Sequence, residues 1–357
     1  MSHSFSKKIL IVPLDWGLGH TTRCIPIIRV FIELGHEVHI GGTPVTNGLL
    51  QIEFPNLKFY EYPSYGISYP KDGKKFLQNI LKLSPGIAKA IKKERDITNS
   101  LNEEHNFDII LSDNRFGVRA KHCKNIFISH QLNLSVPQSK LAERVANYIN
   151  RRFVNKFDKV GVPDWDNHLL SGNLSQKEGI KKEIIFLGNI SRWEYNANLK
   201  GASGALVILS GPEPQRTMLE ALIIEQSGKL SSTLTIVRAK PNEAEDFKND
   251  NIIFYNHLSS KDLQDLVSES EIIISRAGYT TIMDLIAMKK NAILIPTPGQ
   301  TEQEYLATHL DEMNLFTFHR QDKFDLQNAI GDFRKREWGL FPNPENRLRE
   351  KIEELIA

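Results

Sequence analysis

Short apolar stretches alternate with longer segments of helical period along almost the whole chain. The apolar stretches are rich in β-branched residues, and residues 8–13 and 37–41 are typical of them. The segments between them place apolar residues three and four positions apart, as residues 21–34 do. This alternation is typical of parallel βαβ units and predicts an α/β fold.

The apolar stretches predict six strands in each half of the chain. Those of the first half are residues 8–13, 37–41, 57–60, 108–111, 126–129 and 159–162. Those of the second half are residues 204–209, 234–237, 252–255, 271–274, 292–295 and 315–318. Two equal sets predict two similar domains, because a chain of 357 residues is longer than one hydrophobic core usually supports.

A segment with few periodic apolar positions separates the two halves. It runs from Phe186 through Trp193 into polar sequence that ends at Ser203. We therefore predict an N-terminal domain over 1–195 and a C-terminal domain over 196–342. Residues 139–157 are expected to form a long amphipathic helix, and a last helix is expected over 343–356.

Composition and charge narrow the class of protein. The net charge of +2 is too small to indicate binding to nucleic acid. No segment approaches the ~20 apolar residues of a membrane span, and the N-terminus does not resemble a secretory signal, so we expect a cytoplasmic protein. Cys24 and Cys123 lie in segments that are predicted to be buried, which argues against a disulfide or a zinc cluster.

Basic residues gather in three places, and we interpret each as a solvated helix face rather than a contact with an anionic membrane. They are Lys89, Lys92, Lys93 and Arg95; Arg151 and Arg152; and Arg334, Lys335 and Arg336. The amphipathic stretch 74–95 could guide a lipid-linked acceptor, but a helix that faces the core explains it more simply.

The first predicted strand ends in a loop with two glycines, Gly17 and Gly19, and a helix follows at once. Glycines let the backbone approach a ligand closely, and a helix N-terminus favours an anion. His20 stands at the tip of this turn, and imidazole suits proton abstraction near neutral pH, so we predict it as the catalytic base. Three further side chains at predicted strand ends are expected to converge on it, namely Asp15, Asp113 and His130.

Two familiar nucleotide-binding patterns are absent. In a nicotinamide site the third glycine would stand at Thr22, and an acidic residue would follow the second strand where Gly41 and Gly42 stand. No Gly-Lys-Ser/Thr sequence occurs either. We therefore predict neither hydride transfer nor nucleotide hydrolysis, and no cofactor.

A second segment, Ser275 to Asp284, also runs from a strand end into a helix. Its small residues Ala277 and Gly278 bring backbone N–H groups toward a phosphate, and two threonines add hydroxyl donors. The carboxylate of Asp284 can accept hydrogen bonds from a ribose diol. The loop 296–303 is rich in amides and carboxylates that suit sugar hydroxyls.

These segments resemble the MurG-type, family 28 branch of the GT-B glycosyltransferases. Gly17-Leu-Gly-His20 resembles its N-terminal glycine loop, Ser210-Gly-Pro-Glu-Pro214 stands where its C-terminal glycine-rich loop lies, and Glu302-Gln303 resembles its Asp-Gln pair. The resemblance implies two Rossmann-like doubly wound domains facing a cleft, with the C-terminal helix over 343–357 returning to the N-terminal domain.

The resemblance also implies which residues bind the donor, a nucleoside-diphosphate sugar held by the C-terminal domain. They are Gly17, Gly19, Ser210, Gly211, Leu258, Ser275, Arg276, Ala277, Gly278, Thr280, Thr281, Asp284, Gln300, Glu302 and Gln303. This chain departs from the family at Asp284, where glutamate is usual, at Leu306, where asparagine is common, and in loop 210–214, which has one glycine and two prolines. UDP is nevertheless the nucleotide that we expect.

We therefore expect a glycosyltransferase that moves a hexose or N-acetylhexosamine to a hydroxyl of a saccharide or lipid-linked acceptor, with inversion and without a metal. The base is one of His20, Asp15 and Asp113, and membrane contact is at most peripheral. Two alternatives stay open, a nucleotide-sugar 2-epimerase and a non-catalytic protein that binds a sugar nucleotide. An Asp-x-Asp pair, Asp164 and Asp166, is typical of metal chelation in another glycosyltransferase fold, but here we interpret it as part of a turn.

Overall fold

The computed structural model describes residues 6–66, 76–136, 139–195, 203–228, 230, 233–240, 246–249, 251–342 and 347–357. The chain forms two compact units, each with its own sheet. Unit 1 comprises Met1–Ile67, Ile80–Ile190 and Glu345–Ala357, and unit 2 comprises Ser68–Asn79 and Ser191–Pro344. The division falls at Ser191, beside the boundary near residue 195 that the sequence predicts.

The sheet of unit 1 has seven parallel strands in the order β3-β2-β1-β4-β5-β6-β7. Its strands are β1 Lys8–Pro13, β2 Glu37–Gly42, β3 Lys58–Glu61, β4 Ile109–Asp113, β5 Lys124–Ile128, β6 Lys159–Val162 and β7 Glu183–Phe186. Strands β1 and β4 are buried almost throughout, as expected where helices cover both faces of a parallel sheet.

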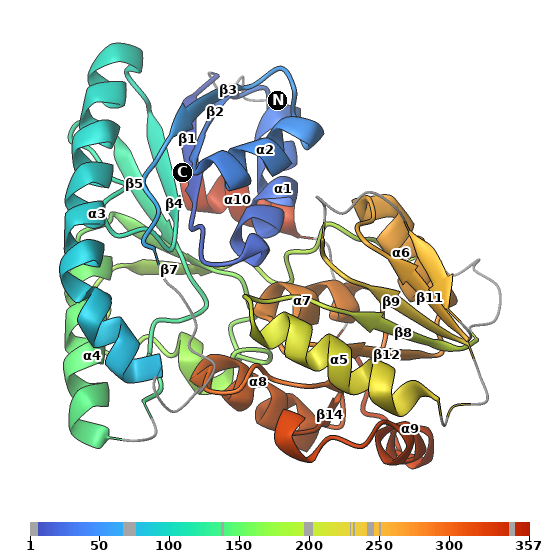
Figure 1. The fold of residues 1–357 in the computed structure, drawn as a ribbon. Helices are drawn as coiled ribbons and strands as arrows, with labels where there is room; N and C mark the ends of the chain where they lie inside the picture. Colours follow the sequence, from blue (N-terminus) through green and yellow to red (C-terminus); the bar gives the residue numbers. More distant parts are fainter. Residues whose placement is uncertain are drawn as a thin grey trace. The chain divides into compact units, whose positions relative to one another are not determined.

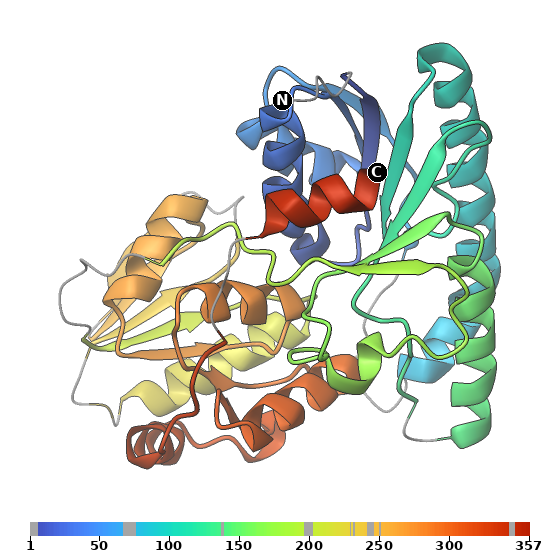
Figure 2. The ribbon, with the colours of Figure 1, turned by 180° about the vertical axis from the view of Figure 1, so that it is seen from behind.

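Helices cover both faces of this first sheet (Figure 1). They are α1 Leu18–Glu33, α2 Pro44–Glu53, α3 Phe76–His105, α4 Lys140–Val154, the 3₁₀ turn η2 Gly172–Ser175, and α10 Leu348–Ile356. Side chains of α3 pack on one face with Leu10 and Ile110. On the other face α10 lies beside α1, as Figure 2 also shows, and packs against β6 and β7.

Three lysines at or beside the strands of unit 1 hydrogen-bond to the end of α10. Lys7, which precedes β1, and Lys124 of β5 donate to the carbonyl of Ile356 at 3.0 and 3.2 Å. Lys159 of β6 donates to the carbonyl of Glu354 at 3.2 Å. A cation at a helix C-terminus is favoured by the helix dipole, so these bonds hold α10 in place.

Unit 2 repeats the plan with a sheet in the order β10-β11-β9-β8-β12-β13-β14, in which only β10 is antiparallel. Its strands are β8 Ala205–Ile208, β9 Leu234–Val237, β10 Phe247–Asn249, β11 Ile252–Tyr255, β12 Ile272–Ser275, β13 Ile293–Leu294 and β14 Thr317–Phe318. Without β10, the order is that of a Rossmann-type sheet, as it is in unit 1 without β7.

The helices of unit 2 alternate with its strands. They are α5 Gln215–Ser227, α6 Ser260–Glu269, α7 Tyr279–Ala287, α8 Thr301–Glu312, the 3₁₀ turn η3 Gln321–Lys323, and α9 Leu326–Lys335. Apolar side chains of α5 and α9, such as Leu219 and Phe333, form one core with the strands. Along the described parts of the chain, no helix is long and apolar enough to cross a bilayer.

The predicted α/β class and the two doubly wound sheets are confirmed, with two corrections. Each described sheet has seven strands rather than six, because β7 has only a short apolar run after Glu183 and the short edge strand β10 mixes apolar with polar residues. Helix α1 begins at Leu18 rather than Thr21, which moves His20 from the tip of a turn into the first turn of the helix. The expected start of the last helix, 343–346, lies outside the described residues, as do 67–75, 196–202 and the side chains of 76–84.

Candidate functional site

Each sheet has a point at which the strand order reverses, and open α/β sheets bind ligands beside such points, at the carboxyl ends of the strands. In unit 1 this point lies between β1 and β4, where the chain continues into Leu14–His20 and Asn114–Gly117. In unit 2 it lies between β8 and β12, where Ser210 and Arg276 follow the strands. Many of the residues predicted from the sequence lie at or beside these two places.

At the carboxyl edge of the first sheet, His20 contacts a buried carboxylate. Its Nδ1 lies 2.9 Å from Oδ1 of Asp113, whose side chain is fully buried, whereas the side chain of His20 is 16% exposed. Arg23, three positions along α1, donates from Nε to Oδ2 of Asp113 at 3.0 Å and pairs through Nη2 with Oδ1. A partly exposed imidazole is thus held against a buried ion pair.

The Nδ1 atom of His20 has two neighbours of opposite character, Asp113 and the Nη2 of Arg23 at 2.7 Å. A guanidinium only donates and an ionised carboxylate only accepts, so one neutral tautomer of His20 suits each neighbour. When Nδ1–H donates to Asp113, Nε2 keeps its lone pair and can take a proton. This tautomer makes His20 a competent base, and the carboxylate stabilises the imidazolium that forms.

Asp113 stays ionised in this network. Burial alone would raise its pKa, but Arg23 and His20 outweigh burial and hold the pKa of Asp113 well below its usual 3.8. Because the folded pKa lies below the unfolded one, the carboxylate contributes stability above about pH 4. That contribution is lost as the pH falls toward the folded pKa.

The structure brings the predicted His130 to the same network through Arg23, a residue that was not predicted from the sequence. Nη1 of Arg23 lies 3.2 Å from Nδ1 of the buried His130, so the guanidinium bridges His130 and Asp113. Arg23 stands three residues after His20, a spacing that places two side chains on one face of a helix. That spacing was the signal in the sequence that could have found it.

Asp15 belongs to a neighbouring ion-pair network. Its Oδ1 lies 3.1 Å from Nη2 of Arg115, while Nη1 of Arg115 lies 2.7 Å from Oε1 of the buried Glu94. Arg115 also donates to the carbonyls of Pro13 and Pro63, at 2.8 Å each. Asp15 is therefore tied into the frame of the loop and makes no contact with His20 among the hydrogen bonds described.

In unit 2 the predicted phosphate loops adjoin one another, since β8, β12 and β13 are neighbours in the sheet. Gly211, with φ of +93°, directs the chain after β8 past the hydroxyl of the buried Thr297, which follows β13. Gly278 is the N-cap residue of α7, so the positive end of the α7 helix dipole lies beside it. Three strand ends and one helix N-terminus thus form a setting suited to an anion.

Five of the predicted donor residues in this setting differ in the groups that they can offer to a ligand. The side chains of Ser275, Arg276 and Ala277 are buried, and the Ser275 hydroxyl donates to the carbonyl of Arg276 at 3.2 Å. Thr280 and Thr281, in the first turn of α7, are partly exposed. Ser275 and Ala277 can therefore reach a ligand only through their backbone, whereas the threonines can offer hydroxyls.

The guanidinium of Arg276 hydrogen-bonds to neighbouring loops and does not extend toward solvent. Its Nη1 donates to the carbonyls of Ile295 and Pro296 at 3.1 Å each, and its Nη2 donates to that of Gln215 at 2.7 Å. Only 1% of the residue is exposed. The guanidinium is committed to backbone that precedes and follows the candidate site, and the predicted role of Arg276 in donor binding stays a prediction.

Asp284, predicted to bind a ribose, is engaged by the segment at the start of unit 2. Its Oδ1 accepts from the hydroxyl of Ser191 at 2.7 Å, and Nε of Arg192 lies 3.3 Å from its Oδ2. Burial raises the pKa of Asp284, and Arg192 and Ser191 oppose the rise. A carboxylate has about four acceptor sites, so these two donors do not exhaust it, but only 2% of Asp284 is exposed, and this burial limits its access to a ribose diol.

Replacing Asp284 by alanine is expected to lower the thermal midpoint of the protein without any ligand. The loss of two charge-assisted bonds costs about 1–3 kcal/mol, and each kcal/mol shifts the midpoint by about 2–4 °C in a domain of this size. Differential scanning fluorimetry measures the shift. The matched control is Asp265→Ala, which removes an exposed partner of Lys261 and should leave the midpoint unchanged. An unchanged midpoint in Asp284→Ala would show that these contacts do not anchor the segment.

The remaining predicted donor residues lie at the start of α8 and after β11. Oε1 of Gln303 accepts from the backbone N–H of Thr297 at 2.8 Å, so it shapes the loop after β13. Gln300 is the N-cap residue of α8, and Glu302 lies in its first turn. Leu258 follows β11 and is partly exposed.

Asp164 is part of a turn, as predicted. Its carboxylate accepts from the backbone N–H groups of Trp165, Leu170 and Ser171, at 2.8, 3.1 and 2.8 Å. Among the residues that the structure describes, no group of three or more His, Cys, Asp or Glu side chains is arranged to hold a metal ion. Burial raises the pKa of both thiols, that of Cys123 to about 11, so neither is a reactive thiolate.

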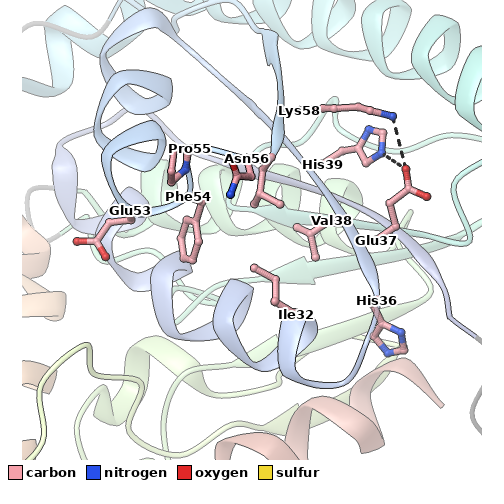
Figure 3. Close-up of a pocket in the computed structure, with 11 residues that line it drawn as sticks. Ile32, His36, Glu37, Val38, His39, Glu53, Phe54, Pro55, Asn56 and Lys58 are labelled. Carbon is pink, nitrogen blue, oxygen red and sulfur yellow. Dashed lines mark hydrogen bonds and ion pairs between the residues drawn. The ribbon is translucent and has the colours of Figure 1, made fainter.

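A cavity of about 430 Å³ lies in unit 1 at the other edge of the first sheet. It is lined by the first residues of β2 and β3 and by the ends of α1 and α2, among them Ile32, Glu37, Phe54 and Lys58 (Figure 3). The strands are parallel, so this cavity is at their amino ends, away from His20 and Asp113. It is not part of the candidate site.

Comparison with known proteins agrees with this geometry. Residues 215–356 match the family described as glycosyltransferase family 28 C-terminal domain. An uncharacterized glycosyltransferase of Methanosarcina mazei is 26% identical over 329 residues, which cover 85% of this chain and 84% of that protein. The UDP-N-acetylglucosamine--N-acetylmuramyl-(pentapeptide) pyrophosphoryl-undecaprenol N-acetylglucosamine transferase of Clostridium tetani is 26% identical over 302 residues, 81% of this chain and 78% of that protein.

Solved structures share the fold. The calicheamicin glycosyltransferase CalG4 superposes with a TM-score of 0.62 over 99% of this chain and 94% of its own, at 11% identity. The fold and the comparisons define the protein as a glycosyltransferase of the GT-B class. Within that class, residues 215–356 resemble the family 28 C-terminal domain, and the chain is similar to the Clostridium tetani transferase of the MurG type.

Proposed function

We propose that the protein transfers a hexose or N-acetylhexosamine from a nucleoside-diphosphate sugar, with UDP as the nucleotide, to an acceptor hydroxyl. The name of the Clostridium tetani relative describes transfer of N-acetylglucosamine from its UDP conjugate. The observation that carries the proposal is the set of three adjoining strand ends in unit 2, which meet at the N-terminus of α7. Such a place favours a diphosphate.

In this proposal His20 takes the proton of the acceptor hydroxyl at Nε2 while Asp113 holds Nδ1–H. The hydroxyl oxygen forms a bond to the anomeric carbon from the face opposite the nucleotide. The bond from that carbon to the diphosphate oxygen breaks, and its electron pair leaves with the nucleotide. One displacement inverts the anomeric configuration, and Arg23 keeps Asp113 ionised throughout.

The negative charge on the departing nucleotide is the second requirement of the reaction. We assign its stabilisation to the helix dipole of α7 and to the hydroxyls of Thr280 and Thr281 rather than to a divalent cation. Turnover is therefore expected to be unchanged by EDTA. Loss of turnover in EDTA that manganese restores would contradict this part of the proposal.

The acceptor in this proposal is a saccharide or a lipid-linked saccharide, and the enzyme works at the periphery of a membrane. The printed name of the Clostridium tetani relative specifies a pyrophosphoryl-undecaprenol acceptor. We assign contact with such an acceptor to a surface of the folded protein.

A panel of nucleotides tests the donor site directly. UDP and UDP-sugars should raise the thermal midpoint, because a ligand present at about 100 times its Kd stabilises the folded state by about 2.7 kcal/mol. GDP, dTDP and adenine nucleotides serve as comparisons. Proton NMR of a UDP-sugar with enzyme and acceptor should show a new glycoside of inverted configuration. A panel in which no nucleoside diphosphate shifts the midpoint would overturn the proposal.

A further inference from the structure

Thr297, which follows β13, has a fully buried side chain beside the proposed donor site of unit 2. Its backbone is engaged on both sides. The N–H donates to Oε1 of Gln303 at 2.8 Å, and the carbonyl accepts from the N–H of Gln300 at 3.0 Å. Its hydroxyl, in contrast, has no hydrogen-bond partner within the described parts of the chain. A buried polar group without a partner lowers the stability of a fold, so this hydroxyl calls for an explanation.

The hydroxyl of Thr297 lies beside the loop that follows β8. A Cβ placed on Gly211 would stand 3.7 Å from Oγ1 of Thr297, and Gly211 itself is exposed, so at this point backbone alone lies over the hydroxyl. Among the hydrogen bonds that the structure describes, none involves Ser210 or Gly211. The N–H groups of both residues and the hydroxyls of Ser210 and Thr297 are therefore donors that an anion could use.

Arg276 connects the same two loops and supplies a positive charge. Its Nη1 donates to the carbonyl of Pro296, the residue before Thr297, at 3.1 Å, and its Nη2 donates to that of Gln215 at 2.7 Å. No carboxylate pairs with this guanidinium in the described portion of the molecule, and burial lowers the pKa of Arg276 to about 9. A buried cation without a counter-charge favours an anion close to it.

We propose that the hydroxyl of Thr297 donates a hydrogen bond to a phosphate oxygen of the sugar donor. This assignment rests on the proposed function, because it requires a nucleoside diphosphate in unit 2. A phosphate oxygen only accepts hydrogen bonds, and its negative charge complements Arg276, which a neutral sugar hydroxyl does not. Because the hydroxyl is fully buried, loop 210–214 shifts to admit the phosphate at Gly211, where no side chain stands in the way.

The substitution Thr297→Val tests the assignment, since it keeps the shape of the side chain and removes the hydroxyl. Without a ligand, its thermal midpoint should equal or exceed that of the wild type, because no bond within the protein is lost. Calorimetric titration should show about tenfold weaker binding of UDP, and an equal loss for a UDP-sugar. Thr297→Ser, which keeps the hydroxyl, should bind both ligands nearly as the wild type does.

The matched control is Thr317→Val on β14. Thr317 is 3% exposed, and its hydroxyl likewise has no partner among the described residues. It pairs with Ile293, the first residue of β13, at the end of the strand away from Thr297. Thr317→Val should therefore leave the affinity for UDP unchanged.

The possible outcomes separate this assignment from the proposed function. A wild type that binds no nucleoside diphosphate would overturn both. If the wild type binds UDP and Thr297→Val binds it as tightly, only the role of Thr297 is overturned. A loss confined to the UDP-sugar would assign the hydroxyl to the sugar instead, and an equal loss in Thr317→Val would attribute the effect to removal of any buried hydroxyl.

Discussion

Replacing His20 by alanine is expected to lower kcat about 100-fold or more while the affinity for the donor stays nearly unchanged. The reason is that His20 lies in unit 1 and, in the proposed mechanism, takes the acceptor proton, whereas the proposed donor site lies in unit 2. Steady-state kinetics together with calorimetric titration of the donor separates the two effects. Asp113→Asn should lower kcat as well, since a neutral amide stabilises the imidazolium less than a carboxylate does.

The control for this experiment is a histidine outside the network. His122 is exposed and has φ of +61°, which asparagine tolerates, so His122→Asn should keep full activity. Full activity in His20→Ala would remove His20 from the catalytic role and direct attention to Asp15. A loss of donor affinity equal to the loss of kcat would indicate general damage to the fold rather than a missing base.

Replacing Arg115 by methionine is expected to destabilise unit 1 by about 3–5 kcal/mol, because Glu94 would remain buried without its cation. Burial already raises the pKa of Glu94, and Arg115 is the main influence that opposes the rise. Without Arg115 the folded pKa lies further above the unfolded one. Stability is then retained at low pH and lost as the pH rises through the folded pKa, so the variant should lose more at pH 8 than at pH 5.

Thermal unfolding of Arg115→Met at both pH values measures this effect, and two further variants control it. Adding Glu94→Gln should recover part of the lost stability, because the amide carries no charge to bury. Arg320→Ala, in an exposed pair with Asp322, should show no measurable change. Equal losses at pH 5 and pH 8 would show that lost packing, and not the charge of Glu94, dominates.

The sequence predicted most strands because buried parallel strands are continuous apolar runs, as β1 and β4 are. It missed β7, where Glu183 precedes a short apolar run, and β10, where Lys248 and Asn249 interrupt the pattern. The orientation of α4 was beyond prediction from periodicity. Two faces of a helix have the same period whichever one faces the core, and here Asn147 and Asn150 are buried with Val154 while Leu141 and Tyr148 are exposed.

The candidate site was predictable in part. The rule that ligands bind at the carboxyl ends of parallel strands predicted His20, Asp113 and His130, which the structure brings together. Contacts between segments that are distant in the chain could not be predicted from the sequence. The Asp284 carboxylate pairs with Arg192, which is 92 positions away in the chain. This contact affects whether the carboxylate is available to a ribose. Arg276 was expected at a ligand because of its neighbours, yet its side chain turns inward to three backbone carbonyls.

The anchoring of α10 affects the order in which the polypeptide can fold during synthesis. Residues 345–357 leave the ribosome only after all of unit 2 has been made, yet Ile352 and Leu355 are fully buried as part of unit 1. Unit 1 must therefore wait, with that apolar surface uncovered, while unit 2 is translated and folds. The first unit to begin folding is thus the last to be completed.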